Sequence, residues 1–282
     1  KFTIFVYFME KQGLLVKMKV SQDDNGAIQY QLRLLDGTLK ESALIPLKEY
    51  INQYIQIQFS GNIQCVNCTK KVKKTFMNGF CYDCFQTSPE ASPCVLRPEL
   101  CRGHLNEGRD LEWEIKNHVQ PHVVYLAASD VVKVGVTRKS QIPTRWIDQG
   151  AHEAIIFAET TNRYLAGVIE VALKDLFTDK TNWRKMLTHQ IDDSIDLEEV
   201  KYRTVELLPS DLQDFFSEDD NIYSFDYPSL QYPEKIKSIN LTKTPNIEKK
   251  LIAIKGQYLI FEDGSVLNIR NHSGYEIKLS AT

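Results

Sequence analysis

Four cysteines in the first half of the chain have the spacing of a metal-binding module. Cys65 and Cys68 form one Cys-x-x-Cys pair, Cys81 and Cys84 form a second, and 12 residues separate the two pairs. Each pair can sit on a tight turn that directs both sulfurs to one point, so the two turns supply four thiolates for tetrahedral Zn²⁺. We therefore expect a structural zinc site. A cysteine-rich core or a redox pair is the alternative.

Three further candidate ligands follow directly, which are Cys94, Cys101 and His104. A fourth ligand would complete a tetrahedral second zinc site, and the two candidates are His118 and His122. We favour His118, because His122 borders the strands described next. The alternative is a buried free Cys94 with His104 at the surface.

Residues 123–126 and 132–137 alternate in the way that two strands of a β-hairpin do. A three-residue loop between them would place Tyr125 opposite Lys133 on one face. Gly135 has no side chain and leaves space beside the backbone at the end of the second strand. The hairpin therefore presents a phenol and an ammonium group side by side.

Charged residues after the hairpin could bind a phosphate or a cation. Arg145 opens a helical stretch 10 residues after Gly135, and an arginine there could clamp a phosphate with two hydrogen bonds. Arg138 is an alternative clamp. The helical pattern of 163–177 carries Glu170 beside apolar neighbours, where a carboxylate is costly unless it has a partner. A hard cation would be such a partner, and an ion pair with a lysine or arginine is the alternative.

The order of Tyr125, Gly135, Arg145 and Glu170 resembles the GIY-YIG nuclease superfamily over roughly 65 of the 282 residues. Tyr125 matches the tyrosine of the first signature triplet, and Gly135 matches the glycine of the second. Lys133 stands where that family has its second tyrosine. The whole chain also resembles a bacterial family of unknown function with a zinc-ribbon-like module before this domain.

This resemblance implies hydrolysis of phosphodiesters in DNA or RNA by an endonuclease that depends on Mg²⁺ or Mn²⁺. The residues to which it gives a catalytic role are Tyr125, Lys133, Arg145, Glu170 and His122. Tyr125 would activate or orient water, Glu170 would hold the cation, and Arg145 would neutralise charge on the phosphate. Lys133 would add positive charge, and His122 would be a second base.

Two alternatives to an enzyme remain open at this stage. Lys133 at the tyrosine position favours a non-catalytic zinc protein that binds nucleic acid on a degenerate GIY-YIG scaffold. A protein–protein adaptor that uses the acidic C-terminal half is the other alternative.

Asn182 is a weaker match to an asparagine that often follows the family's glutamate.

The elements that must position these residues indicate an α+β protein. We expect antiparallel β segments on both sides of a zinc-ribbon-like module and a GIY-YIG-like central domain. The expected parts are a β segment (1–64), a zinc-binding module (65–117), an α+β domain (118–192), and a helical linker with a final β segment (193–282). We expect the two terminal β segments to pair into one discontinuous domain, because neither is large enough to bury a core alone.

Alternation and turn residues predict the strands of the two terminal segments. The expected strands are Leu14–Val20, Ile28–Leu34, Tyr54–Phe59, Tyr258–Phe261, Val266–Ile269 and Tyr275–Leu279. Residues 195–216 have an acidic helical pattern.

Charge is distributed unevenly along the chain. Residues 65–145 carry 12 Lys/Arg against 8 Asp/Glu, whereas residues 146–282 carry 15 against 23. A basic centre allows a contact with nucleic acid, and the four lysines of the cysteine hairpin (Lys70, Lys71, Lys73 and Lys74) could meet phosphates. A solvated charge imbalance explains the same counts.

Composition predicts an ordinary globular chain, with 43% hydrophobic and 25% charged residues. The apolar run Phe2–Phe8 is much shorter than the roughly 20 residues that span a bilayer, and it lacks a cleavage site. We therefore expect a cytoplasmic protein without a membrane partner. Met9 is a candidate native start, which would make the first eight residues a doubtful leader.

Overall fold

The computed structural model describes residues 10–177 and 182–281. Phe2–Phe8 and the proposed start at Met9 lie outside these residues. The chain divides into two compact units: a β unit, formed by residues up to 85 and from 226 onward, and a central unit, residues 86–225. The predicted zinc-binding module 65–117 is therefore shared between the units. No helix in the described part of the chain is long and apolar enough to span a membrane.

The β unit is built on one nine-stranded sheet in the order β3-β2-β1-β13-β4-β10-β11-β12-β9. Its strands are β1 (Glu10–Gln22), β2 (Ile28–Leu35), β3 (Glu41–Pro46), β4 (Tyr54–Ile63), β9 (Lys237–Ser238), β10 (Asn246–Lys255), β11 (Tyr258–Phe261), β12 (Ser265–Asn268) and β13 (Tyr275–Ala281). Its short helices are η1 (Lys48–Tyr50), η2 (Met77–Gly79) and η8 (Arg270–His272), and α1 (Tyr82–Thr87) spans the division between the units.

Strands from the two ends of the chain alternate within this sheet. The last strand, β13, lies between β1 and β4, with Gln12 opposite Lys278 and Ile57 opposite Leu279. Neighbouring strands of this sheet run antiparallel, except β9 and β12, which are parallel. The N-terminal and C-terminal β segments therefore complete one another's hydrogen bonding.

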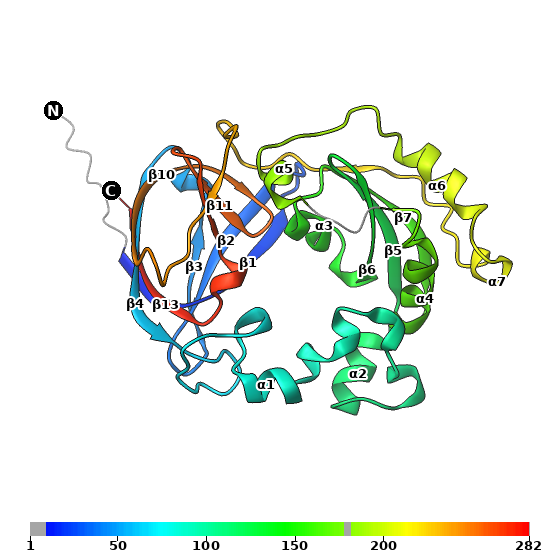
Figure 1. The fold of residues 1–282 in the computed structure, drawn as a ribbon, viewed down its shortest axis with the longest axis horizontal. Helices are drawn as coiled ribbons and strands as arrows, with labels where there is room; N and C mark the ends of the chain where they lie inside the picture. The colour runs from blue at the N-terminus through cyan, green and yellow to red at the C-terminus, as the bar shows by residue number, and fades with distance from the viewer. Residues whose placement is uncertain (1–9, 178–181, 282) are drawn as a thin grey trace. The chain divides into compact units, whose positions relative to one another are not determined.

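The sheet of the β unit curls on itself, as Figure 1 shows. Gln257, at the turn between β10 and β11, reaches the backbone of Met18 on β1. The Met18 N–H donates to Gln257 Oε1 at 2.8 Å, and Gln257 Nε2 donates to the Met18 carbonyl at 3.3 Å. Both residues are buried, so these bonds satisfy backbone groups inside the curl.

The central unit contains an antiparallel sheet in the order β6-β5-β7-β8. Its strands are β5 (His122–Ala128), β6 (Val132–Arg138), β7 (Glu153–Thr160) and β8 (Tyr223–Ser224). Its helices are α2 (Leu111–His118), α3 (Thr144–Gln149), α4 (Arg163–Leu173), α5 (Trp183–Leu187), α6 (Leu197–Val205) and α7 (Ser210–Gln213). Short 3₁₀ turns complete it, which are η3 (Pro89–Ala91), η4 (Pro93–Val95), η5 (Pro98–Leu100), η6 (Gly103–Leu105) and η7 (Lys139–Gln141). The chain is thus a mixed α+β protein with antiparallel sheets.

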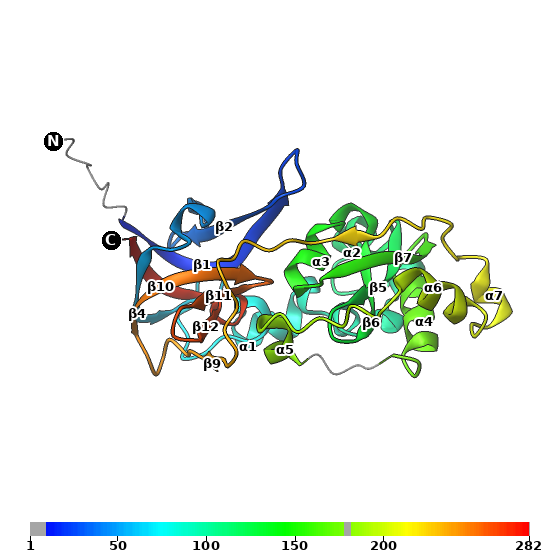
Figure 2. The same ribbon diagram turned by 90° about the horizontal axis from the view of Figure 1, so that it is seen from above.

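Helices α4 and α6 lie at the β5-β6-β7 sheet, as Figure 2 shows from above. Val124 and Leu126 of β5 pack in one buried cluster with Ala166 and Ile169 of α4 and Leu197 of α6. Alternate residues of a strand point to opposite faces, so Tyr125 belongs to the other face. Helix α4 ends at Leu173, earlier than the helical pattern of 163–177 predicted.

The hairpin register differs from the predicted one by two residues. Tyr125 lies opposite Gly135, and Lys133 lies opposite Ala127. A Cβ atom on residue 135 would come within 2.6 Å of the Tyr125 hydroxyl oxygen. The tyrosine ring therefore needs glycine opposite it, which fixes the observed register. The two-residue shift keeps Tyr125 and Lys133 on one face.

We expect the substitution Gly135→Ala to lower the free energy of unfolding by about 1–3 kcal/mol, because the new methyl group must displace the buried phenol of Tyr125. Denaturant unfolding of both proteins measures this difference. Gly37→Ala is the matched control, since a Cβ there meets no atom within 4 Å. Equal losses in the two variants would show that Tyr125 does not depend on the glycine.

Candidate functional site

The four cysteines of the two Cys-x-x-Cys pairs converge on one point in the β unit. Their sulfur atoms all lie within 4.8 Å of one another. The chain turns between the pairs through Asn78 (φ 59°) and Gly79 (φ 102°). A Cβ on Gly79 would lie 2.9 Å from Val66 and from Ser273, so only glycine allows this turn. The group could hold a zinc ion.

The donors around these sulfurs suit thiolates. The Asn67 N–H approaches Cys65 Sγ at 3.4 Å, and the Cys84 N–H approaches Cys81 Sγ at the same distance. Burial raises the pKa of the Cys65 thiol, but backbone N–H groups outweigh it and lower that pKa to about 7. Four sulfurs with amide N–H donors fit Zn²⁺ and leave no position for a substrate.

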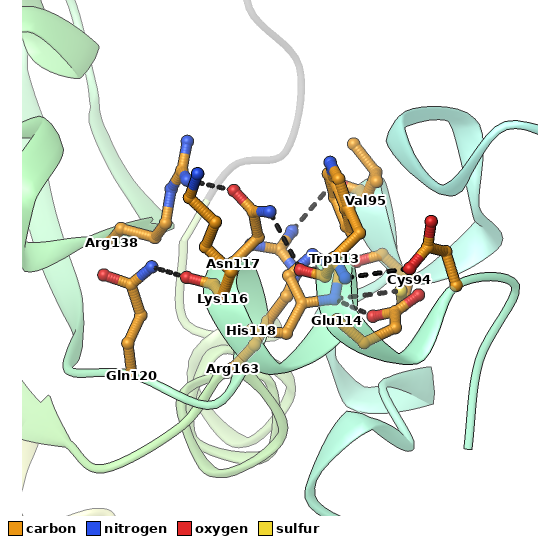
Figure 3. Close-up of polar contacts among 11 residues, drawn as sticks. Cys94, Val95, Trp113, Glu114, Lys116, Asn117, His118, Gln120, Arg138 and Arg163 are labelled. Carbon is orange, nitrogen blue, oxygen red and sulfur yellow. Dashed lines mark hydrogen bonds and ion pairs between the residues drawn. The ribbon is translucent and has the colours of Figure 1, made fainter. Parts of the chain in front are cut away.

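A second group of metal-ligating side chains lies in the central unit. It consists of Cys94, Cys101, Glu114 and His118, and one donor atom of each lies within 4.8 Å of the others. All four residues are buried. Figure 3 shows Cys94, Glu114 and His118 turned toward one another.

His104, which the sequence placed in this group, lies elsewhere. Its ring stacks on Tyr164 with the ring centroids 4.6 Å apart. The backbone of Gly103 runs closely along α2, so that a Cβ there would be 3.5 Å from the Cβ atoms of Glu114 and His118. His104 is therefore not one of the four grouped residues, and Glu114 takes the place predicted for it.

A cavity of about 330 Å³ in the central unit gathers several of the predicted catalytic residues. Tyr125, Lys133 and Glu170 line it, together with Gln149 and Lys174. Glu170 is the only carboxylate among the described lining residues, whereas two lysines face the same space. The cavity therefore suits an anion such as a phosphate.

Tyr125 is almost completely buried and donates its hydroxyl hydrogen to Gln149 Oε1 at 2.5 Å. Burial raises the pKa of this phenol, and the nearby Arg145 guanidinium only partly opposes the increase. The hydroxyl therefore stays protonated near neutral pH, with its oxygen still able to accept a hydrogen bond. Tyr125 is better suited to orienting a water molecule than to acting as a base.

Arg145 lies beside the cavity without being one of its lining residues. It is on α3, and its charge lowers the pKa of both Tyr125 and Glu170 against the stronger effect of burial. Lys133 is half-buried, and burial lowers the pKa of its ammonium group, with Asp130 opposing. The cationic side chains that act on the Glu170 carboxyl are Arg163, Lys174 and Arg145, and the Glu99 carboxylate opposes them.

His122 does not join this cavity. It is three residues from Tyr125 and therefore on the other face of β5, and it lies opposite Arg138 and Thr160. Its Nδ1–H donates to the Gln120 carbonyl at 2.7 Å. Burial lowers the pKa of His122 to about 4, so its imidazole is neutral near pH 7.

The two weaker matches have structural partners. Arg138 donates to Asn117 Oδ1 (Figure 3) and is not among the cavity residues. Asn182 caps α5, because its side chain accepts a hydrogen bond from the Arg184 N–H at 3.2 Å. In the cysteine hairpin, Lys70 pairs with Asp83 at 3.0 Å.

Sequence reasoning missed Glu114, Gln149 and Lys174. Glu114 and His118 are four residues apart on α2 and share one helical face, which is a signal that the sequence carries. Gln149 follows Arg145 by four residues on α3, so both project from one side of that helix. Lys174 follows α4 directly and had no such signal.

The Glu170 carboxyl is unusual, because burial raises its pKa to about 7 against the nearby charges of Arg163, Lys174 and Arg145. In the unfolded chain its pKa is about 4.3. Between these values the unfolded chain releases a proton that the folded chain keeps, so the stability contributed by this group falls as pH rises from about 4 to 7.

We therefore expect Glu170→Gln to be more stable than the wild type at pH 8, by about 1–3 kcal/mol, in buffer without added Mg²⁺ or Mn²⁺. The difference should vanish near pH 4. Urea unfolding at the two pH values measures it. A difference that is the same at both values would mean that Glu170 does not carry a raised pKa.

The fold and the sites define a mixed α+β protein with antiparallel sheets and a cysteine cluster that could bind zinc. A sequence profile described as "Protein of unknown function (DUF2797)" matches residues 52–277. The chain belongs to this family, which confirms the resemblance to a family of unknown function. No curated protein and no solved structure is detectably similar to the chain.

Proposed function

We propose that this protein hydrolyses phosphodiester bonds in nucleic acid at the cavity of the central unit. The observation that carries the proposal is the convergence of Tyr125, Lys133 and Glu170 on one cavity, with Arg145 beside it. The hairpin β5-β6, helix α3 with Arg145 and helix α4 with Glu170 also follow in the order that the resemblance implies for these residues.

The chain's own residues would hold the phosphate and a water molecule. Lys133, Lys174 and Arg145 neutralise the phosphate charge as it grows in the transition state. The Tyr125 hydroxyl donates to Gln149 and accepts a hydrogen bond from the attacking water. The water oxygen bonds to phosphorus, one ester P–O bond breaks, and the released oxygen takes the proton that the attacking water loses.

Glu170 is the residue that would hold a divalent cation. A single carboxylate suits Mg²⁺, which keeps several waters and takes further oxygens from the phosphate. When bound, the cation supplies electrostatic stabilisation of the leaving oxygen. The raised pKa of Glu170 fits this role, because burial outweighs the charges of Arg163, Lys174 and Arg145, and a bound cation would further offset the cost of the buried carboxylate.

We also propose that Cys65, Cys68, Cys81 and Cys84 hold a structural Zn²⁺. Its role is to fold the hairpin between the two pairs. The hairpin lysines would then be presented on a rigid element that can meet nucleic acid phosphates.

The test is incubation of the zinc-loaded full chain with single- and double-stranded DNA and RNA, with Mg²⁺, Mn²⁺ or neither. We expect cleavage only when a divalent cation is added. Salt-dependent binding without cleavage of any substrate would overturn the proposal in favour of a non-catalytic binding protein, the reading that Lys133 at the tyrosine position supports.

A further inference from the structure

We propose that Cys94, Cys101, Glu114 and His118 form a second, buried Zn²⁺ centre, with a carboxylate as one of its four ligands. This centre is independent of the hydrolysis proposed above. Its role is to tie the irregular segment 94–101 to helix α2.

The geometry brings the four donors to one point. Besides the common separation of at most 4.8 Å, Cys94 Sγ lies 3.9 Å from His118 Nδ1, and a Glu114 carboxylate oxygen contacts the same nitrogen. The relative exposures are 7% for Cys94, 2% for Cys101, 2% for Glu114 and 4% for His118. Two sulfurs, one imidazole nitrogen and one carboxylate oxygen are all ligand types that Zn²⁺ accepts.

An ion pair of Glu114 with a protonated His118 would account for two of the four groups. It gives no reason for two cysteines at the same buried point. A cation accounts for all four, because it compensates the burial of a carboxylate next to thiolates.

The surrounding segment also needs a constraint of this kind. Residues 89–105 are built from the four short turns η3, η4, η5 and η6. Three of its leucines are exposed, with 75% of Leu96, 44% of Leu100 and 52% of Leu105 accessible to solvent. A short segment that buries little apolar surface is commonly held by a metal ion.

The segment between the two cysteines lies against α4. Arg163 donates from Nε to the Cys94 carbonyl and from Nη2 to the Val95 carbonyl, each at 2.9 Å (Figure 3). A Cβ on Gly167 would be 2.2 Å from the Glu99 nitrogen, so the backbone of the segment packs directly against α4 at this glycine. Leu96 lines the cavity that contains Glu170. The metal centre would thus fix one wall of that cavity.

The test is to measure the number of zinc ions per purified full chain by elemental mass spectrometry. We expect two zinc ions per chain in the wild type and one in Cys101→Ser. His104→Ala is the matched control and should keep two, because His104 stacks on Tyr164 outside the group. The same zinc content in the wild type and Cys101→Ser, or the loss of one ion in His104→Ala, would each overturn the proposal.

X-ray absorption of the wild type keeps the proposal testable if Cys101→Ser does not fold. Six sulfurs shared by two ions give an average of three sulfurs and one nitrogen or oxygen per zinc. The shells should lie at about 2.3 Å for sulfur and about 2.0–2.2 Å for the lighter ligand. A shell of sulfur alone would contradict a Cys₂-Glu-His centre.

Discussion

Replacing Glu170 by glutamine should reduce cation-dependent cleavage of nucleic acid by at least about 10²–10³-fold, the loss expected when one electrostatic group of a transition state is removed. Glutamine keeps the shape of the side chain but not the charge that would hold the cation. The cavity then contains Lys133 and Lys174 with no carboxylate among its described lining residues. The rate of nicking of a labelled substrate at saturating Mg²⁺ measures the loss.

Glu206→Gln is the matched control for this experiment, because Glu206 is exposed at the end of α6. It should cleave at the wild-type rate. Glu170→Gln should remain folded, since the substitution removes the cost of a buried carboxylate. Full activity in Glu170→Gln would rule out this carboxylate as the cation ligand.

The substitution Cys81→Ser should release one zinc ion and strongly destabilise the β unit. Structural zinc sites contribute about 10–16 kcal/mol of binding free energy in small peptides. A thousandfold loss of affinity therefore removes about 4 kcal/mol of stability. Zinc content and thermal unfolding measure the two effects.

Lys73 lies on the same hairpin and its side chain is exposed. The control substitution Lys73→Ala should therefore change neither the zinc content nor the melting temperature. The second centre offers an internal comparison, because Cys101→Ser should release an ion from the central unit instead. A Cys81→Ser protein that keeps all its zinc and its melting temperature would contradict a structural role for the four cysteines.

Local patterns in the sequence predicted much of the fold. Alternation located β2 closely, because one of its faces is consistently buried, and the apolar run with its flanking turn residues located β11, which is buried on both faces. It missed β10 (Asn246–Lys255), because the charged residues 248–250 interrupt the alternation and the residues after them are all buried. The hairpin register was also missed, because it is set by the Tyr125 ring, which occupies the space where a side chain at position 135 would lie.

The candidate sites divide in the same way. The close pairs Cys65/Cys68 and Cys81/Cys84 act through local turns, so their spacing was enough to group them. His104 was misplaced because nearness in sequence to Cys101 says nothing about the direction in which η6 turns. His122 was assigned to the cavity although three residues along a strand reverse the face. Glu170 lines the same cavity as Tyr125, although the two residues are 45 positions apart in the sequence.

The central claim is that Glu170 holds a divalent cation in the cavity that also contains Tyr125 and Lys133. Crystals of the full chain soaked with Mn²⁺ and a short oligonucleotide, and measured at a wavelength where manganese scatters anomalously, test it directly. We predict an anomalous peak at the Glu170 carboxylate, with a phosphate oxygen bound to the same ion and close to Lys133. An oligonucleotide bound elsewhere, with no manganese at Glu170, would contradict the account.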